Sequence, residues 1–107
     1  MSAARWAAPA SLWFEVRNVL LMGERRRRLS EGQTSRFLRY LAELPIEVDR
    51  EPDEALMLSL ARRYRLGVYD AVYLELAQRQ ALPLATLDQA LIDAARSEKV
   101  PLVGEGA

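Results

Sequence analysis

Apolar residues along the chain recur at helical spacing in five stretches and gather in four short, strand-like runs. The helices are predicted over about residues 12–26, 31–44, 52–66, 68–80 and 89–97, and the strands over residues 5–8, 46–49, 82–86 and 100–103. The order β-α-α-β-α-α-β-α-β is typical of an α/β fold with a parallel sheet flanked by helices. A chain of 107 residues without a linker or repeat is expected to form one domain, residues 1–107.

Polar residues and glycines at the ends of the stretches predict where the helices begin and end. Ser11 is placed to cap the first helix, and Ser30 with Gln33 has the form of a capping box for the second. Pro52 suits the first position of the third helix. Gly67 is expected to end that helix in the left-handed conformation.

Acidic residues stand on helix faces that are otherwise apolar. Asp70 is in a first turn, on the side that also carries Tyr73, Leu74 and Ala77, so its carboxylate is expected to point inward. Glu15 borders the predicted inward stripe of the first helix, which consists of Leu12, Val16, Val19, Leu20 and Gly23. An inward carboxylate either caps its own helix or faces a metal ion or another charge.

A third acid, Asp88, follows the predicted strand 82–86. Helices that follow parallel strands begin at the edge where the strands end, so Glu15, Asp70 and Asp88 are expected at one edge. Two carboxylates about 5 Å apart repel by roughly 3 kcal/mol at an effective dielectric near 20, which favours a bound cation. Mg²⁺ or Mn²⁺ with open positions would support phosphodiester hydrolysis by metal-bound water. Capping or a dipole interaction stays the alternative for each acid.

Composition narrows the chemistry of such a site. The chain has no cysteine and no histidine, which excludes disulfides, thiolate ligands and imidazole ligands and leaves carboxylate oxygens for a hard cation. Fifteen basic and fifteen acidic residues cancel, so net charge gives no argument for nucleic acid. Arg25–Arg28 is a run that suits either a solvated helix end or RNA contact. No membrane-spanning run or signal core is present, and we expect a soluble, cytoplasmic protein.

Three segments of the chain carry a family resemblance. Leu12–Leu20, Tyr69–Ala77 and Leu84–Leu91 resemble the second, third and fourth acidic motifs of PIN-domain proteins, with the best likeness to VapC-type toxins of bacterial toxin-antitoxin pairs. The resemblance implies a Mg²⁺- or Mn²⁺-dependent endoribonuclease of a type II system, held inactive by a small VapB-like antitoxin and usually a homodimer. It also implies that the metal carboxylates are Glu15, Asp70 and Asp88, that Thr86 is a hydroxyl near the site, and that Asn18 supports it.

The sequence departs from the family pattern at its beginning. PIN domains start with a strand that carries the first catalytic aspartate, whereas this chain starts about where the second strand is expected and has no acid before Glu15. The resemblance therefore implies a three-layer PIN-like fold without its first strand and first helix, and a gap between the strands near Arg5 and Leu84. We expect weak or no nuclease activity from this chain. The alternative is a non-catalytic truncated PIN module that binds an antitoxin or another protein.

Overall fold

Two short segments, WAAP and IEVD, pair in parallel in the computed structural model, which describes residues 6–104. Only Trp6, Ile46 and Val48 among their residues are strong β-formers. β1 is Trp6–Pro9 and β2 is Ile46–Asp49, with Trp6 opposite Ile46 and Pro9 opposite Asp49. Within residues 6–104 the chain also forms five helices, α1 (Leu12–Arg25), α2 (Glu31–Ala42), α3 (Glu54–Tyr64), α4 (Val68–Gln80) and α5 (Gln89–Ser97). The predicted α/β class with a short parallel sheet is confirmed.

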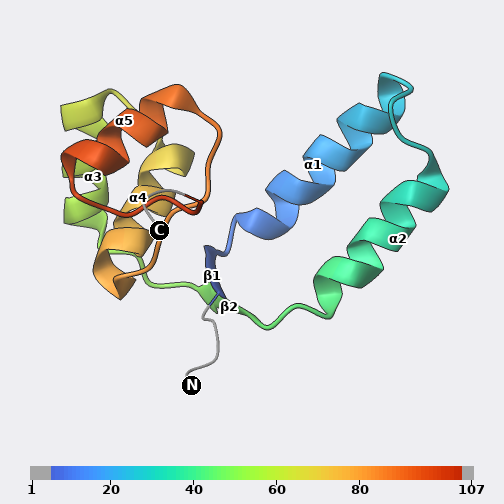
Figure 1. Cartoon of the computed structure of the whole chain (residues 1–107), viewed down its shortest axis with the longest axis horizontal. Coiled ribbons are helices and arrows are strands. Elements are labelled where there is room, and N and C mark those ends of the chain that lie inside the picture. The colour runs from blue at the N-terminus through green and yellow to red at the C-terminus, as the bar shows by residue number, and fades with distance from the viewer. Residues whose placement is uncertain (1–5, 105–107) are drawn as a thin grey trace.

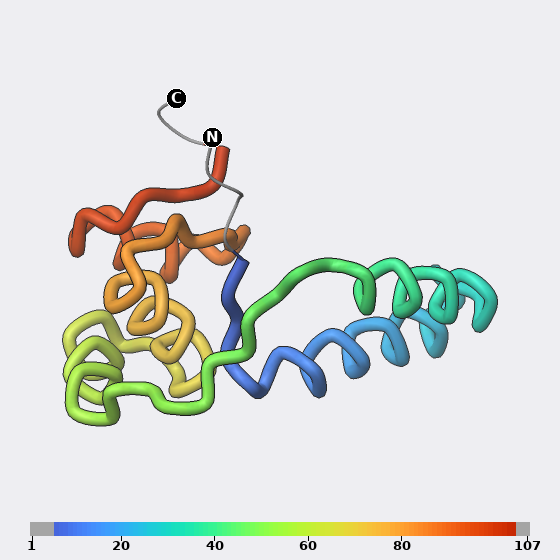
Figure 2. Tube along the Cα trace, turned by 90° about the horizontal axis from the view of Figure 1, so that it is seen from below, coloured from blue at the N-terminus to red at the C-terminus, as the bar shows by residue number. Residues whose placement is uncertain are grey.

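The helices separate into two groups on either side of the sheet. Helices α3, α4 and α5 lie together, whereas α1 and α2 run side by side away from them as an arm (Figures 1 and 2). The Cα radius of gyration is 15.1 Å, above the roughly 13 Å expected for a compact domain of this length. The arm therefore adds length to the molecule without adding to its main core.

The main hydrophobic core belongs to the α3–α5 side of the molecule. Leu60 of α3, Leu74 of α4 and Leu91 of α5 are buried there and meet Leu84 and Leu102 of the segments that follow α4 and α5. By contrast, α2 has no buried residue and α1 buries only Leu20. The interior of the domain is thus organised around α4, the helix that opens with the Asp70 segment.

Several predicted helix boundaries are confirmed. Ser30 and Gln33 form the capping box: the Ser30 N–H donates to Oε1 of Gln33 at 2.9 Å and the Gln33 N–H donates to Oγ of Ser30 at 3.1 Å. Helix α4 ends at Gln80, and α5 spans Gln89–Ser97 as predicted. At these positions the neighbouring sequence determines the helix boundary, through a capping side chain or a chain reversal.

Three predictions about helix boundaries are wrong. Arg65, and not Gly67, takes the left-handed conformation after α3, with φ 53°, while Gly67 is the extended residue before α4. Pro52 is not the first helical residue, because the Asp53 side chain caps α3 by accepting from the Leu56 N–H at 3.0 Å. Ser11 precedes α1 but makes no side-chain cap, since its backbone is already helical at φ −66° and ψ −18°.

The predicted inward stripe of α1 is also partly wrong. Leu20 is buried, but Val19 is 69% exposed and the aromatic pair Trp13 and Phe14 is exposed as well. The spacing identified an apolar face correctly, yet on the arm only α2 packs against that face. A helical repeat predicts which residues share a face and leaves open how much of that face is covered.

The predicted strands 82–86 and 100–103 shorten to a single parallel bridge between Leu84 and Leu102. The Leu84 N–H donates to the Pro101 carbonyl at 2.8 Å, and the Val103 N–H donates to the Leu84 carbonyl at 2.9 Å. The next bond of a parallel ladder would need an N–H at residue 101, and Pro101 has none, so the pairing cannot extend toward Leu82. Arg5, where the first strand was predicted to begin, lies outside the described residues.

A buried ion pair ties α4 to β2. Glu75 is fully buried, and Arg79, one turn later, donates to both of its carboxylate oxygens. The same guanidinium donates to the two oxygens of Asp49 in β2 at 3.1 and 2.7 Å. Because Glu75 has no contact with water, Arg79 is the group that makes its charge tolerable inside the domain.

Replacing Arg79 with methionine is therefore expected to lower the free energy of unfolding by about 3 kcal/mol, because the Glu75 carboxylate would remain buried without its cation. Urea denaturation measures this change. The exposed Arg62 on α3 is the matched control, and Arg62→Met should change stability by no more than about 0.5 kcal/mol. Equal losses in the two variants would contradict this role for Arg79.

Candidate functional site

The three predicted site acids all lie where a helix begins. Glu15 is in the first turn of α1, Asp70 is in the first turn of α4, and Asp88 is the N-cap of α5. Burial raises the pKa of the Asp70 carboxyl, and the negative charges of Asp88 and Glu15 raise it further. Asp70 is thus near enough to Asp88 and Glu15 for their charges to act on it, although their elements are far apart in sequence.

Asp70 does not cap its own helix. Helix α4 begins after Gly67 without a side-chain cap, so the carboxylate of Asp70 is not used to satisfy the free N–H groups of the first turn. This removes the capping alternative for Asp70. The carboxylate is partly buried beside two like charges, and it forms no ion pair with the part of the chain that the structure describes.

Asp88, in contrast, does cap its helix. Its Oδ2 accepts from the Leu91 N–H at 3.0 Å, and its own N–H donates to Oγ1 of Thr86 at 3.0 Å. The Thr86 hydroxyl therefore lies at the site by holding the backbone of Asp88. A cap uses only one carboxylate oxygen, so Asp88 can cap α5 and also lie near Asp70.

Tyr73 links α4 to Glu15 and was not singled out as a site residue from the sequence. Its hydroxyl donates a hydrogen bond to Oε2 of Glu15. Burial, and then this bond, raise the pKa of the Tyr73 hydroxyl well above its ordinary value, so it stays a donor at neutral pH. Its position three residues after Asp70, on the same helical face, was the available sequence signal.

Asn18 lies elsewhere on α1. It is exposed and borders a hollow near the far end of the arm together with Met22, Arg26 and Arg28. The Asn18 side chain forms no hydrogen bond with another residue between 6 and 104. The structure therefore brings Glu15, Asp70, Asp88 and Thr86 together and does not bring Asn18 to them.

The surface of α1 that faces the hollow toward α2 is aromatic and basic. Trp13 and Phe14 are 57% and 72% exposed, and their rings meet edge to face with centroids 5.0 Å apart. The guanidinium of Arg17 lies 3.8 Å from the centre of the Trp13 ring and donates to the Trp13 carbonyl at 3.0 Å. Because residues two apart on a helix do not share a face, this cation–aromatic pair lies on a different side of α1 from Glu15.

The donor chemistry of the acids suits a hard divalent cation, because each offers carboxylate oxygens and their mutual repulsion would be relieved by positive charge. Their spacing is wider than a closed metal site needs. Between residues 6 and 104 no three acidic side chains lie close enough together to hold one ion. The arrangement is a set of converging carboxylates and not a preformed ion cage.

Asp70→Asn is expected to raise the free energy of unfolding at pH 7, since the folded state no longer holds a carboxylate whose pKa is raised. A raised pKa means that the folded state takes up a proton more readily than the unfolded chain, so the wild-type penalty is relieved as pH falls. The difference between the two proteins should therefore shrink below about pH 4. Thermal unfolding from pH 3 to 8 measures it. The exposed Glu51→Gln should show no such difference, and a constant gap for Asp70→Asn would contradict the repulsion.

Comparison with known proteins places this arrangement in a family. The model of the PIN domain matches residues 1–97, which is most of the chain. A search among curated proteins finds no relative. The helices described between residues 6 and 104 include none long and apolar enough to cross a membrane. PIN domains are nuclease-type domains that generally depend on divalent metal ions. On the strength of this match and of the converging acids, the chain belongs to the PIN-domain family.

Proposed function

We propose that the protein is a divalent-metal-dependent endoribonuclease of the VapC type, the toxin of a type II toxin-antitoxin pair. The observation that supports the proposal is that Glu15, Asp70 and Asp88 stand at the starts of three helices, where burial and then the charges of Asp88 and Glu15 raise the pKa of Asp70. Membership of the PIN family supports hydrolysis of a phosphodiester as the reaction. The proposed location is the cytoplasm, where RNA is made.

Glu15, Asp70 and Asp88 would hold Mg²⁺ or Mn²⁺ partly through bound waters, because the three side chains lie too far apart for all of them to bind one ion directly. When bound, such an ion activates water and neutralises charge on a phosphate. The chain's own residues orient the ligands: the Tyr73 hydroxyl holds Oε2 of Glu15, and the Thr86 hydroxyl holds the backbone of Asp88. The Leu91 N–H donates to Oδ2 of Asp88, which leaves Oδ1 available to a ligand.

RNA would be held by the aromatic and basic surface of α1 that faces the hollow toward α2. The exposed rings of Trp13 and Phe14 offer faces on which bases stack, and the guanidinium of Arg17 offers donors to a phosphate. These contacts carry no base identity by themselves, so they support binding of single-stranded RNA with little sequence preference.

The arm is proposed as the surface for a VapB-like antitoxin or for a second copy in a homodimer. A hollow of about 490 Å³ lies between α1, α2 and the sheet, with Leu38 and Leu41 among its walls. Phe37 and Tyr40 on α2 are 45% and 65% exposed. Helices α1 and α2 together bury only Leu20, so the arm leaves a large apolar surface uncovered. The same surface supports a second candidate function, a non-catalytic module that binds a protein partner.

RNA cleavage in the presence of Mn²⁺ tests the enzymatic proposal. Because no acid precedes Glu15, we expect the wild-type chain to cut a single-stranded RNA only weakly. EDTA should abolish this cutting, and Asp70→Asn should reduce it by at least about 100-fold, the scale of losing a charge that acts in the transition state. Glu51→Gln, which removes an exposed acid, should stay within about twofold of wild type. No cutting by the wild-type chain would favour the non-catalytic module, and equal cutting by Asp70→Asn would contradict the site.

Calorimetry with Mn²⁺ tests the ligand set without a substrate. Asp70→Asn keeps the size and shape of the side chain and removes its charge, so we expect Mn²⁺ affinity to fall by at least about tenfold, as for loss of a metal-site residue. Tyr73→Phe should weaken Mn²⁺ binding less, because it frees Glu15 without removing a carboxylate. Unchanged Mn²⁺ affinity in Asp70→Asn would exclude this residue as a ligand.

A further inference from the structure

Four consecutive arginines, Arg25–Arg28, lie at the far end of the arm, where α1 passes into α2 (Figures 1 and 2). We call residues 25–28 the arm tip. All four are exposed, and within residues 6–104 none of them forms an ion pair. The acids nearest in sequence are Glu24 and Glu31, so four positive charges stand beside two negative ones. The arm tip is therefore positive.

The end of α1 does not require four arginines. The carbonyl oxygens of Gly23 and Glu24 accept from the N–H groups of Arg28 and Arg27 at 2.9 and 3.0 Å. These two hydrogen bonds form a Schellman motif, which is made by backbone groups and not by side chains. The helix dipole favours positive charge only in the last turn, where Arg25 already lies. Stabilisation of the helix end thus accounts for one arginine of the run.

A left-handed residue turns the chain at the arm tip. Arg27 has φ 57°, and its neighbours Arg26 and Arg28 line one hollow whereas Arg27 does not. Gly23 makes the turn possible, because a Cβ at residue 23 would lie 2.8 Å from Cδ1 of Leu29. The local sequence therefore brings the side chains of Arg26 and Arg28 to the same place.

The hollow at the arm tip is suited to an anion. Its volume is about 480 Å³, and none of the described residues that line it is acidic. Its walls include Asn18 of α1, whose side chain has no hydrogen-bond partner in the described part of the chain and supplies a neutral donor. Guanidinium groups bind phosphate oxygens with pairs of parallel hydrogen bonds. Two guanidinium groups and an amide around an open hollow therefore fit a phosphate backbone.

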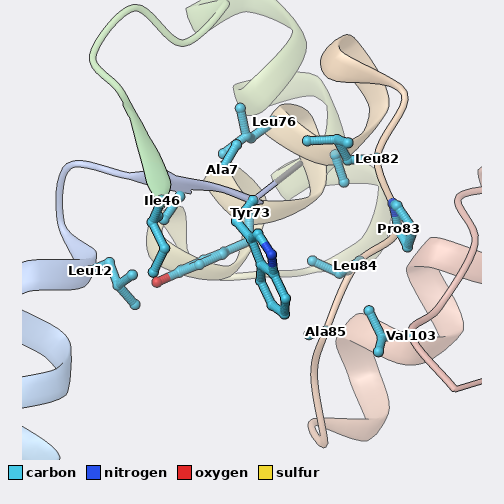
Figure 3. Close-up of a pocket in the computed structure, with 13 residues that line it drawn as sticks. Ala7, Leu12, Ile46, Tyr73, Leu76, Leu82, Pro83, Leu84, Ala85 and Val103 are labelled. Atoms are coloured by element: carbon cyan, nitrogen blue, oxygen red, sulfur yellow. The ribbon is translucent and has the colours of Figure 1, made fainter. Parts of the chain in front are cut away.

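The hollow lies on the face of α1 that begins with Glu15. Met22 and Arg26 follow Glu15 at helical spacing and share this face. The Tyr73 hydroxyl donates to Glu15, and Figure 3 shows the Tyr73 ring directed toward Leu12 at the beginning of α1. Eleven residues at about 1.5 Å each place Arg26 roughly 16 Å beyond Glu15 along the helix axis. A free phosphate ion cannot reach both positions, whereas a polynucleotide presents phosphates along its whole length.

We propose that the arm tip anchors the sugar–phosphate backbone of an RNA substrate at a distance from the bond that is cut. Arg26 and Arg28 bind phosphate oxygens, and the Asn18 amide donates to the same stretch of backbone. The inference rests on the proposed nuclease function, because it adds a second contact to the RNA that is cut at the three acids. Contacts to phosphates do not read bases, so the arm tip contributes affinity and position and no sequence preference.

Anisotropy of a labelled single-stranded RNA of about 20 nucleotides measures the anchor, with EDTA present so that no cutting occurs. Arg26→Gln combined with Arg28→Gln should weaken binding at least about tenfold at low salt, because two phosphate contacts are lost. The slope of log affinity against log salt concentration should fall by about 1.4, since each contact to a single strand contributes about 0.7. An affinity and a salt slope equal to those of the wild type would overturn the proposal.

Arg36→Gln combined with Arg39→Gln is the matched control, because it removes two exposed arginines of the same arm that do not line the hollow. It should bind the RNA within about twofold of wild type, with circular dichroism confirming that both double variants fold. A loss as large as that of the arm-tip variant would mean that the charge of the whole arm attracts RNA, and would overturn a site at the hollow.

A labelled decaglutamate peptide tests whether the arm tip prefers a protein partner. It should bind much more weakly than the RNA, and equal binding that depends on Arg26 and Arg28 would overturn the proposal in favour of an acidic protein segment. RNA binding that depends on the arm tip, without any cutting in Mn²⁺, would support the anchor and contradict only the proposed nuclease activity.

Discussion

Parallel pairing fixes where the chemistry of this domain can be. β1 and β2 run in one direction, so α1 and α3 both leave from the same edge of the pair. The bridge between Leu84 and Leu102 is parallel as well, and the segment that carries Leu84 delivers Asp88. A parallel arrangement gathers helix N-termini and the ends of strands at one edge. This constraint brings Glu15 and Asp88 to one edge, and α4, which follows α3, brings Asp70 near enough for their charges to raise its pKa.

The energetics of that edge separate acids that look alike in sequence. Glu75 is the most buried acid, but Arg79 compensates its charge and makes it a structural residue. Asp88 stabilises α5 with one oxygen. Asp70 has neither a cap nor an ion pair within residues 6–104, and burial with two like charges raises its pKa. A carboxylate that costs stability and satisfies no structural need is typical of a functional site.

Much of this could be predicted from sequence, and the errors have physical causes. Capping residues such as Ser30 act on their own helix, so α2 and α5 were located well. Val19 was placed inside because periodicity gives a face and not its cover. The hydrogen bond of Tyr73 was missed because its partner Glu15 is distant in sequence. Glu75 and Arg79 are four residues apart, so helical spacing could have paired them, but the burial of Glu75 and the second bond of Arg79 to Asp49 depend on tertiary packing. Tertiary contacts of this kind have no periodic signature.

The central claim is that Glu15 and Asp88 share one electrostatic site with Asp70. The most direct test is to titrate the Asp70 carboxyl carbon by NMR in the wild-type chain and in Glu15→Gln and Asp88→Asn. The account predicts a wild-type pKa above the ordinary value for aspartate, and a lower pKa in each variant because one neighbouring negative charge is gone. An Asp70 pKa that is ordinary in the wild type, or unchanged in both variants, would contradict it.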